Sequence, residues 1–327
     1  MGITNTTKSA LFVKSGGVLP VAPANFIEST SPVLINPDIA STDFKRVSGK
    51  LNATESYVDV ANAQASFSIE HMMRSNNKAG TALSTPPEYS ELLKICGFDE
   101  AIDTSVPSNE FITYTNTQTP VLGSAVAVLD TNQFTFTGSL ASDLTMEFEA
   151  GASAKISAGL QGYIDSATPT VVAQPSVTLS SEPLMIVSNY STVVLGGVTL
   201  KPDKVTISTN PEIADNYTMG GANGLKSKQM TDYSLTCTID FYVDNADYDR
   251  EITAIESQST ATLDIKVGTD NTGTLVNGQS MHLTAGLVKT ETQSDSDENN
   301  QLKRSVTYKI LNGASDIALS MRVGFFA

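Results

Sequence analysis

Short runs of alternating apolar and polar residues dominate the chain, and such runs are typical of half-buried β-strands. In the first half they lie at residues 56–73, 111–117, 124–130, 134–140, 144–150 and 154–164. In the second half they lie at residues 231–243, 261–267, 280–290, 302–311 and 316–326. The pattern therefore predicts a mainly β protein.

One segment, TPPEYSELLKICGF at residues 85–98, has the pattern of a helix instead. Thr85 is a suitable N-cap, Pro86 falls at the first helical position, and Glu88 completes a capping box. Gly97 can take the left-handed position after the helix, with Phe98 packing back on Leu93. Apolar residues at helical spacing form one stripe that we expect to cover a sheet: Tyr89, Leu92, Leu93 and Cys96.

A second helix is predicted directly after the long strand pattern at residues 231–243. Asn245 can cap it, and Tyr248, Ile252 and Ile255 recur on one face. The order of strand, helix and further strands thus occurs twice, at an interval of about half the chain. We interpret this as two tandem β-sandwich or barrel modules, each with one flanking helix. Chance similarity of two β-rich halves is the alternative.

The predicted organisation has four parts. Residues 1–33 form an N-terminal arm, 34–168 a first module, 169–182 a Pro/Ser/Thr-rich linker, and 183–327 a second module.

Composition narrows the classes of function. The net charge is −15 and the pI about 4.5, without the Lys/Arg cluster that a grip on nucleic acid needs. Cys96 and Cys237 fall in apolar patterns and are interpreted as buried thiols without a disulfide framework. The N-terminus lacks a signal-peptide pattern, and no apolar run is long enough to span a membrane, so we expect no membrane insertion.

Catalytic chemistry is not indicated by any motif. His71 and His282 lie far apart in sequence and are interpreted as structural, and we expect no catalytic residue, metal or cofactor. Residues 244–251 lack the glycine and final glutamate of a calcium loop. The acidic residues within 294–300 are expected at a solvated hairpin tip, with cation binding as the alternative: Asp295, Asp297 and Glu298.

The segment that contains the first helix resembles siphophage major tail tube proteins, in which a Gly/Ala/Pro-rich loop precedes a helix of the type Leu-Leu-x-x-Cys-Gly-Phe. The resemblance extends over most of residues 35–327, including FTFTGSLASDLTMEFEA and LGGVTLKPDKVTIST. One departure is Asn116, where the family more often has Pro. The matching packing residues are Gly80, Pro86, Pro87, Leu92, Leu93, Cys96, Gly97 and Phe98.

The resemblance implies a structural protein of the virion tail, assembled in the host cytoplasm. Tail tube modules are β-sandwiches whose sheets join around a lumen, and rings of them stack into the tube that conducts DNA. With two modules per chain, three chains would complete a pseudo-sixfold ring, although six chains is the alternative. The resemblance implies as partners the chain itself, tail terminator and tail tip or baseplate proteins, a tape measure protein in the lumen, and transiently passing double-stranded DNA.

Two loops and the N-terminal arm are expected to contact the next ring. The candidate loop residues are Asn76, Asn77, Lys78, Gly221, Asn223 and Lys226. Three other functions remain open: a type VI-like secretion tube with the same fold, a monomeric adhesin or carbohydrate-binding β-sandwich, and a hydrolase on a β-scaffold. The absence of Trp argues against a stacking surface for sugars. A hydrolase would need a clustered acid pair, which the sequence does not locate.

Overall fold

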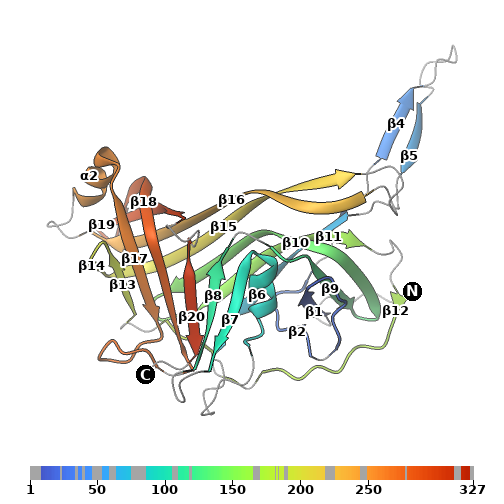
Figure 1. Cartoon of the computed structure of the whole chain (residues 1–327), viewed down its shortest axis with the longest axis horizontal. Coiled ribbons are helices and arrows are strands. Elements are labelled where there is room, and N and C mark those ends of the chain that lie inside the picture. The colour runs from blue at the N-terminus through green and yellow to red at the C-terminus, as the bar shows by residue number, and fades with distance from the viewer. Residues whose placement is uncertain are drawn as a thin grey trace.

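Figure 1 shows the chain as a computed structural model that is mainly β, as predicted from the alternating pattern. The structure describes residues 9–22, 24–33, 36–38, 41–45, 54–58, 64–74, 86–104, 110–117, 120–164, 170–180, 182, 184–187, 191–217, 225–243, 249–276, 278–312 and 318–324.

The first half of the chain contributes one helix and most of the shorter strands. They are β1 (Ser9–Ser15), β2 (Phe26–Ile27), β3 (Asn36–Asp38), β4 (Ser41–Lys45), β5 (Thr54–Val58), β6 (Gln64–Met72), α1 (Ser90–Ile95), β7 (Phe98–Asp103), β8 (Phe111–Asn116), β9 (Gly123–Leu129), β10 (Asn132–Glu149) and β11 (Lys155–Ile164).

The second half contributes the other helix and the longest strands. They are β12 (Thr170–Val171), β13 (Thr192–Leu195), β14 (Val198–Leu200), β15 (Pro202–Tyr217), β16 (Leu225–Tyr242), α2 (Arg250–Ser257), β17 (Thr260–Val267), β18 (Ser280–Glu298), β19 (Gln301–Leu311) and β20 (Ser320–Gly324).

Antiparallel pairing joins all these strands except β4 and β5 into one branched sheet. Seven of its strands follow one another as neighbours in the order β6–β11–β10–β15–β16–β19–β18. Three ladders among the described strands join the halves of the chain: β10 with β12, β10 with β15, and β8 with β20. The β4–β5 hairpin projects from the end of the molecule opposite to α2 (Figure 1).

The segment expected as an N-terminal arm contains two strands of this sheet. β1 pairs with β9 over its whole length, and Leu11 and Val13 are fully buried in the main core. Residues 9–15 therefore form a strand of the sheet and contribute side chains to the main core. Which part of the chain belongs to which module remains a prediction.

Helix α1 begins four residues later than predicted, at Ser90 with Tyr89 as its N-cap residue. The expected start at Thr85 is wrong. Pro87 keeps the preceding residue extended, and its carbonyl accepts a 2.9 Å hydrogen bond from the Ser90 amide in a turn. The end of the helix is as expected, because Gly97 has a φ of +88°.

The apolar stripe of α1 is completely buried, as predicted. Tyr89, Leu92, Leu93 and Cys96 are all 0% exposed, and the helix packs against β1, β7 and β10. Glu91 adds a polar tie, because its carboxylate accepts a 2.7 Å hydrogen bond from the Ser15 amide of β1. The helix therefore closes the core over the first half of the sheet.

Helix α2 does not follow the predicted pattern. It begins at Arg250 with Asp249 as N-cap residue, so the start expected at Asn245 is wrong. Ile252 is 40% exposed, whereas Glu251 is 1% exposed. The helix turns its acidic side chain inward because a buried arginine lies beneath it, as described below.

The residues expected at an acidic hairpin tip lie within strand β18 instead. β18 continues to Glu298, and the turn to β19 consists of Asn299 and Asn300, both with positive φ. A two-residue turn with left-handed residues matches the right-handed twist of the strands that it joins. Asp295, Asp297 and Glu298 thus belong to the sheet.

We expect acid to destabilise the fold through His71, which is 1% exposed. Its Nδ1 donates to the Glu28 carbonyl at 2.7 Å, and burial holds the pKa of its imidazole below the usual value. Below about pH 6.5 the unfolded chain binds a proton that the folded chain resists, so the unfolding free energy falls. Urea titrations at pH 7.5 and 5.5 should show a smaller loss in the variant His71→Phe. An equal loss in both proteins would contradict this assignment.

Candidate functional site

One face of the long sheet is lined by small polar side chains. Residues directly opposite each other on paired strands share a face, so the registers define rows across the sheet. One row crosses six strands through Glu70, Ser157, Thr145, Ser208, Thr236 and Lys309. A second runs through Lys155, Glu147, Thr206, Thr238, Thr307 and Thr292. A third runs through Glu149, Lys204, Asp240, Ser305 and Ser294.

We call this surface the Ser/Thr face, defined by those three rows. It continues without interruption across the β10–β15 ladder, where the halves of the chain meet. The neighbouring side chains on these strands point the other way and are buried, among them Met146, Ile207, Ile239 and Val306. The sheet thus has one apolar face covered by the rest of the chain and one hydroxyl-rich face.

Two of the three lysines on the Ser/Thr face, Lys155 and Lys204, are held by one carboxylate. Glu147 binds Lys155 and Lys204, each with an Nζ–Oε distance of 3.0 Å. The two ammonium groups hold the pKa of the Glu147 carboxyl below its usual value, Lys204 contributing most. Hydroxyl groups also bond across strands, with 3.1 Å between Thr238 Oγ1 and Thr307 Oγ1. The face therefore exposes hydroxyl groups and one carboxylate that two ammonium groups share.

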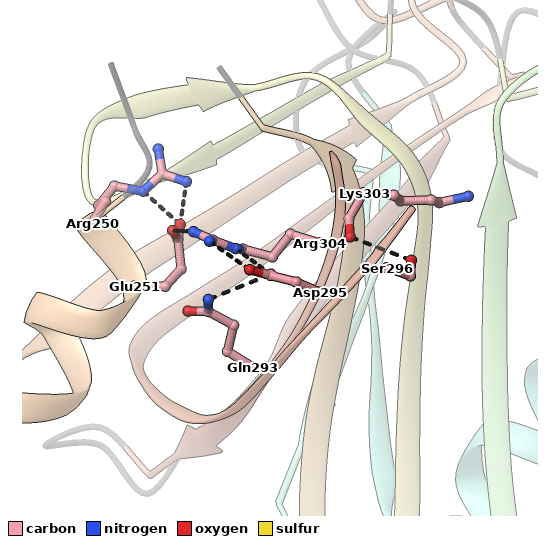
Figure 2. A network of polar contacts seen from close by, with 7 residues as sticks. All are labelled: Arg250, Glu251, Gln293, Asp295, Ser296, Lys303 and Arg304. Atoms are coloured by element: carbon pink, nitrogen blue, oxygen red, sulfur yellow. Dashed lines mark hydrogen bonds and ion pairs between the residues drawn. The ribbon is translucent and has the colours of Figure 1, made fainter. Parts of the chain in front are cut away.

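A cluster of charged side chains lies beneath α2 at the other side of the sheet (Figure 2). Arg304, on β19, is fully buried and holds both carboxylate oxygens of Asp295 at 2.8 and 3.0 Å. Its third contact is with Glu251, 3.2 Å away. Arg250 binds the remaining oxygen of Glu251 through Nε at 2.7 Å. Arg304 lowers the pKa of the Asp295 carboxyl.

Most of the family-motif residues that the structure describes are packed in the core, and Gly80 lies outside the described residues. Leu92, Leu93, Cys96 and Phe98 are buried, while Pro86 is exposed before the helix and Pro87 is half-buried. Burial raises the pKa of the Cys96 thiol and, to about 12, that of Cys237, so both thiols are protonated at neutral pH. Both cysteines are free.

The candidate inter-ring loops fall mostly outside the described residues. Asn76, Asn77, Lys78, Gly221 and Asn223 are not described, and only the backbone of Lys226 is, as part of β16. Their role in contacts between rings stays a prediction.

Metal chemistry finds no support among the residues that the structure describes, where no three His, Cys, Asp or Glu side chains gather around one point. His282 Nε2 lies 3.0 Å from Asp264 in a cross-strand contact. In the described part of the chain no helix is long and apolar enough to cross a membrane.

The structure is a mainly β protein of paired antiparallel strands, with a buried apolar stripe on α1 and a hydroxyl-rich sheet face. A family model described as phage tail tube protein matches residues 6–310. The chain belongs to this family of structural tail tube proteins, whose members are components of the virion tail. A search of the curated proteins finds no match to this chain.

Two sequence repeats become visible once the strands are placed. Gly-Gly-Val occurs at residues 16–18 after β1 and again at 196–198 after β13, with all four glycines at positive φ. Asn-Pro-Asp-Ile-Ala at 36–40 resembles Asn-Pro-Glu-Ile-Ala at 210–214 in sequence, but the strand ladders compared below make Ser208, not Asn210, the counterpart of Asn36. Gly-Gly-Val lies at turns after strands, whereas the Asn-Pro motif begins at β3 in the first half and lies within β15 in the second.

Proposed function

We propose that the chain polymerises as stacked rings into the tail tube that conducts DNA from the capsid to the host cell, with the Ser/Thr face lining the lumen. The observation that carries this is the continuity of that face across both halves of the chain. A sheet that already joins two halves edge to edge is suited to joining further copies in the same way.

Each chain supplies two tube modules in this proposal. The order of pairing β1–β9–β10–β11–β6 in the first half has a counterpart, β13–β17–β18–β19–β16, in the second. β12 on β10 likewise corresponds to β20 on β18, whereas the β7–β8 hairpin has no counterpart among the described strands. This agreement supports a ring of three chains with six modules.

The first module in this scheme begins at β1, because β1 occupies the place of β13. Residues 9–27 then belong to the module, and only the preceding residues form an arm. The partners follow from the tube role: tail terminator and tail tip or baseplate proteins at its ends, and a tape measure protein and passing DNA in the lumen. The chain acts as a conduit and performs no catalysis.

The chemistry of the Ser/Thr face suits a conduit for DNA. Free lysines would bind phosphate and hold the DNA, whereas lysines already paired with carboxylates attract it weakly. Short hydroxyl side chains present no large apolar surface to the passing duplex. A lumen of this kind lets DNA slide.

We expect that releasing these lysines makes the protein retain DNA. In the variant Glu147→Gln, Lys155 and Lys204 lose their shared carboxylate, so retention of double-stranded DNA by assembled tubes at low salt should rise several-fold and disappear at high salt. Glu212→Gln, which changes the same charge on an exposed residue outside the three rows, is the control. Equal retention by both variants would argue against a lumenal Ser/Thr face.

Assembly itself tests the proposed function. Purified chain, alone or seeded with tail tip protein, should form uniform hollow filaments in negative-stain electron microscopy. A protein that stays monomeric under all these conditions would favour the adhesin or carbohydrate-binding alternative.

A further inference from the structure

The β10–β15 ladder shows how a strand from the second half of the chain pairs with a strand from the first half. Beyond a bulge at Ala141 and Asp143, the segment Leu144–Glu149 of β10 has β11 on one side and β15 on the other. β15 in turn lies on the outer side of β16. An edge strand of the second half thus completes the sheet of the first.

The corresponding segment of β18, at the far end of the sheet, has a strand neighbour on one side only among the described residues. β18 has its own bulge at Thr290 and Thr292, and the segment beyond it, Gln293–Glu298, pairs with β19 on one side. On the other side β17 reaches only Lys289, and no described strand pairs with the rest. β3, which lies on β6 as β15 lies on β16, pairs with no other strand in the described part of the chain.

We propose that β18 of one chain pairs with β3 of a second copy, with Ser294 opposite Asn36. This proposal rests on the proposed tube function and assigns the residues of its interchain junction. The pairing partner is a second copy of the chain, because each chain carries both strands of the junction. β18 lies at one end of its long run of strands and β3 at the other.

The register follows from the ladders that the two halves share. Matching the bulges of β10 and β18 makes Thr145 the counterpart of Ser294 and Ile156 the counterpart of Arg304. Ile156 pairs with His71 and Arg304 with Phe241, so these two positions correspond in turn.

Counting five residues back from His71 along β6 and from Phe241 along β16 makes Ser66 the counterpart of Thr236. Ser66 pairs with Asn36, and Thr236 pairs with Ser208. Ser208 faces Thr145 inside the chain, so Asn36 should face Ser294 between chains.

The β10–β15 junction within the chain and the proposed β18–β3 junction between chains differ in the side chains on their core side. This difference disfavours pairing of a strand at the wrong junction. The core side of the β10 segment carries Leu144, Met146 and Phe148, all buried by β15. The corresponding positions of β18 are Gln293, Asp295 and Asp297. Charged residues on an open strand edge oppose uncontrolled pairing of unassembled chains. We infer that the acidic residues of β18 disfavour pairing of this edge in unassembled chains, so that the edge pairs only in the ring.

Disulfide trapping tests the register. Facing residues of an antiparallel ladder have Cα atoms about 4.5–5.5 Å apart, within the range of a disulfide. We expect the double variant Asn36→Cys/Ser294→Cys, oxidised after assembly, to give covalent dimers and trimers on non-reducing gels. The controls Asn36→Cys/Thr292→Cys and Asn36→Cys/Ser296→Cys, displaced by two residues, should stay mostly monomeric. Cys96 and Cys237 are buried and do not compete.

The outcomes separate this inference from the proposed function. Tubes that form without cross-linking, or that cross-link only in a displaced control, overturn the β18–β3 register and leave the tube role intact. Wild-type protein that never forms tubes refutes the tube role itself. If the cysteine variants fail to fold, hydrogen exchange on the wild type decides: amides of residues 293–298 must gain at least tenfold protection on assembly, and unchanged exchange overturns the proposal.

Discussion

Replacing Arg304 with methionine is expected to lower the free energy of unfolding by about 3 kcal/mol. Arg304 is fully buried, and its removal leaves Glu251, itself 1% exposed, with Arg250 but without the second guanidinium that binds it from β19. Broken buried ion pairs cost about 3–5 kcal/mol, and the lower end applies here because Asp295 is partly exposed. Urea denaturation of the unassembled chain at pH 7.5 measures the effect.

The neighbouring Lys303 provides the control for this prediction. It also binds two carboxylates, Asp203 and Glu298, but both are exposed, so Lys303→Met should cost no more than about 1 kcal/mol. Equal effects of Lys303→Met and Arg304→Met would contradict the buried network in Figure 2.

The first half of the chain suggests how the loss could be recovered. There, Met146 and Ile156 occupy the places of Asp295 and Arg304, and both are 0% exposed. The triple variant Glu251→Leu/Asp295→Met/Arg304→Ile should therefore recover most of the stability, because apolar residues replace Arg304 together with both carboxylates that it binds. The triple variant also loses the carboxylate of Asp295 on the open edge of β18, so we expect the variant protein to aggregate more readily.

The second large effect is expected at α1. Leu93→Ala should destabilise the chain by about 2–5 kcal/mol, because Leu93 is 0% exposed within the main core and the removed atoms leave a cavity. The same kind of truncation in α2, Ile252→Ala, should change the unfolding free energy by less than about 0.5 kcal/mol, since Ile252 is 40% exposed. Similar losses in both variants would mean that α2 covers a core as α1 does.

The contrast between the two helices shows what the sequence could predict. The stripe of α1 and the left-handed Gly97 follow local rules, and the structure confirms both. The start of α1 was misplaced because consecutive prolines suit an extended entry as well as a first helical turn. For α2, the pattern of Ile252 and Ile255 predicted a buried stripe, but a distant arginine on β19 decides which face turns inward.

The candidate surfaces depended still more on long-range pairing. Alternation showed that β10, β16 and β19 each have a polar side, but only their registers show that these sides join into one face. Residues 294–300 lie between two strand patterns, which predicts a hairpin tip, and Asp and Asn are depleted in strands. The position of this acidic segment at an open sheet edge explains the composition, and no local rule predicts which edge of a sheet is open.

Averaging of tube cross-sections by electron cryomicroscopy tests the central claim most directly. The account predicts three chains per ring, six similar modules joined edge to edge, and Thr145, Ser208 and Thr238 facing the lumen. A ring of six chains would contradict the two-module plan and leave the tube role standing. A tube whose lumen is lined by other surfaces, with the Ser/Thr face turned outward, would contradict the account itself.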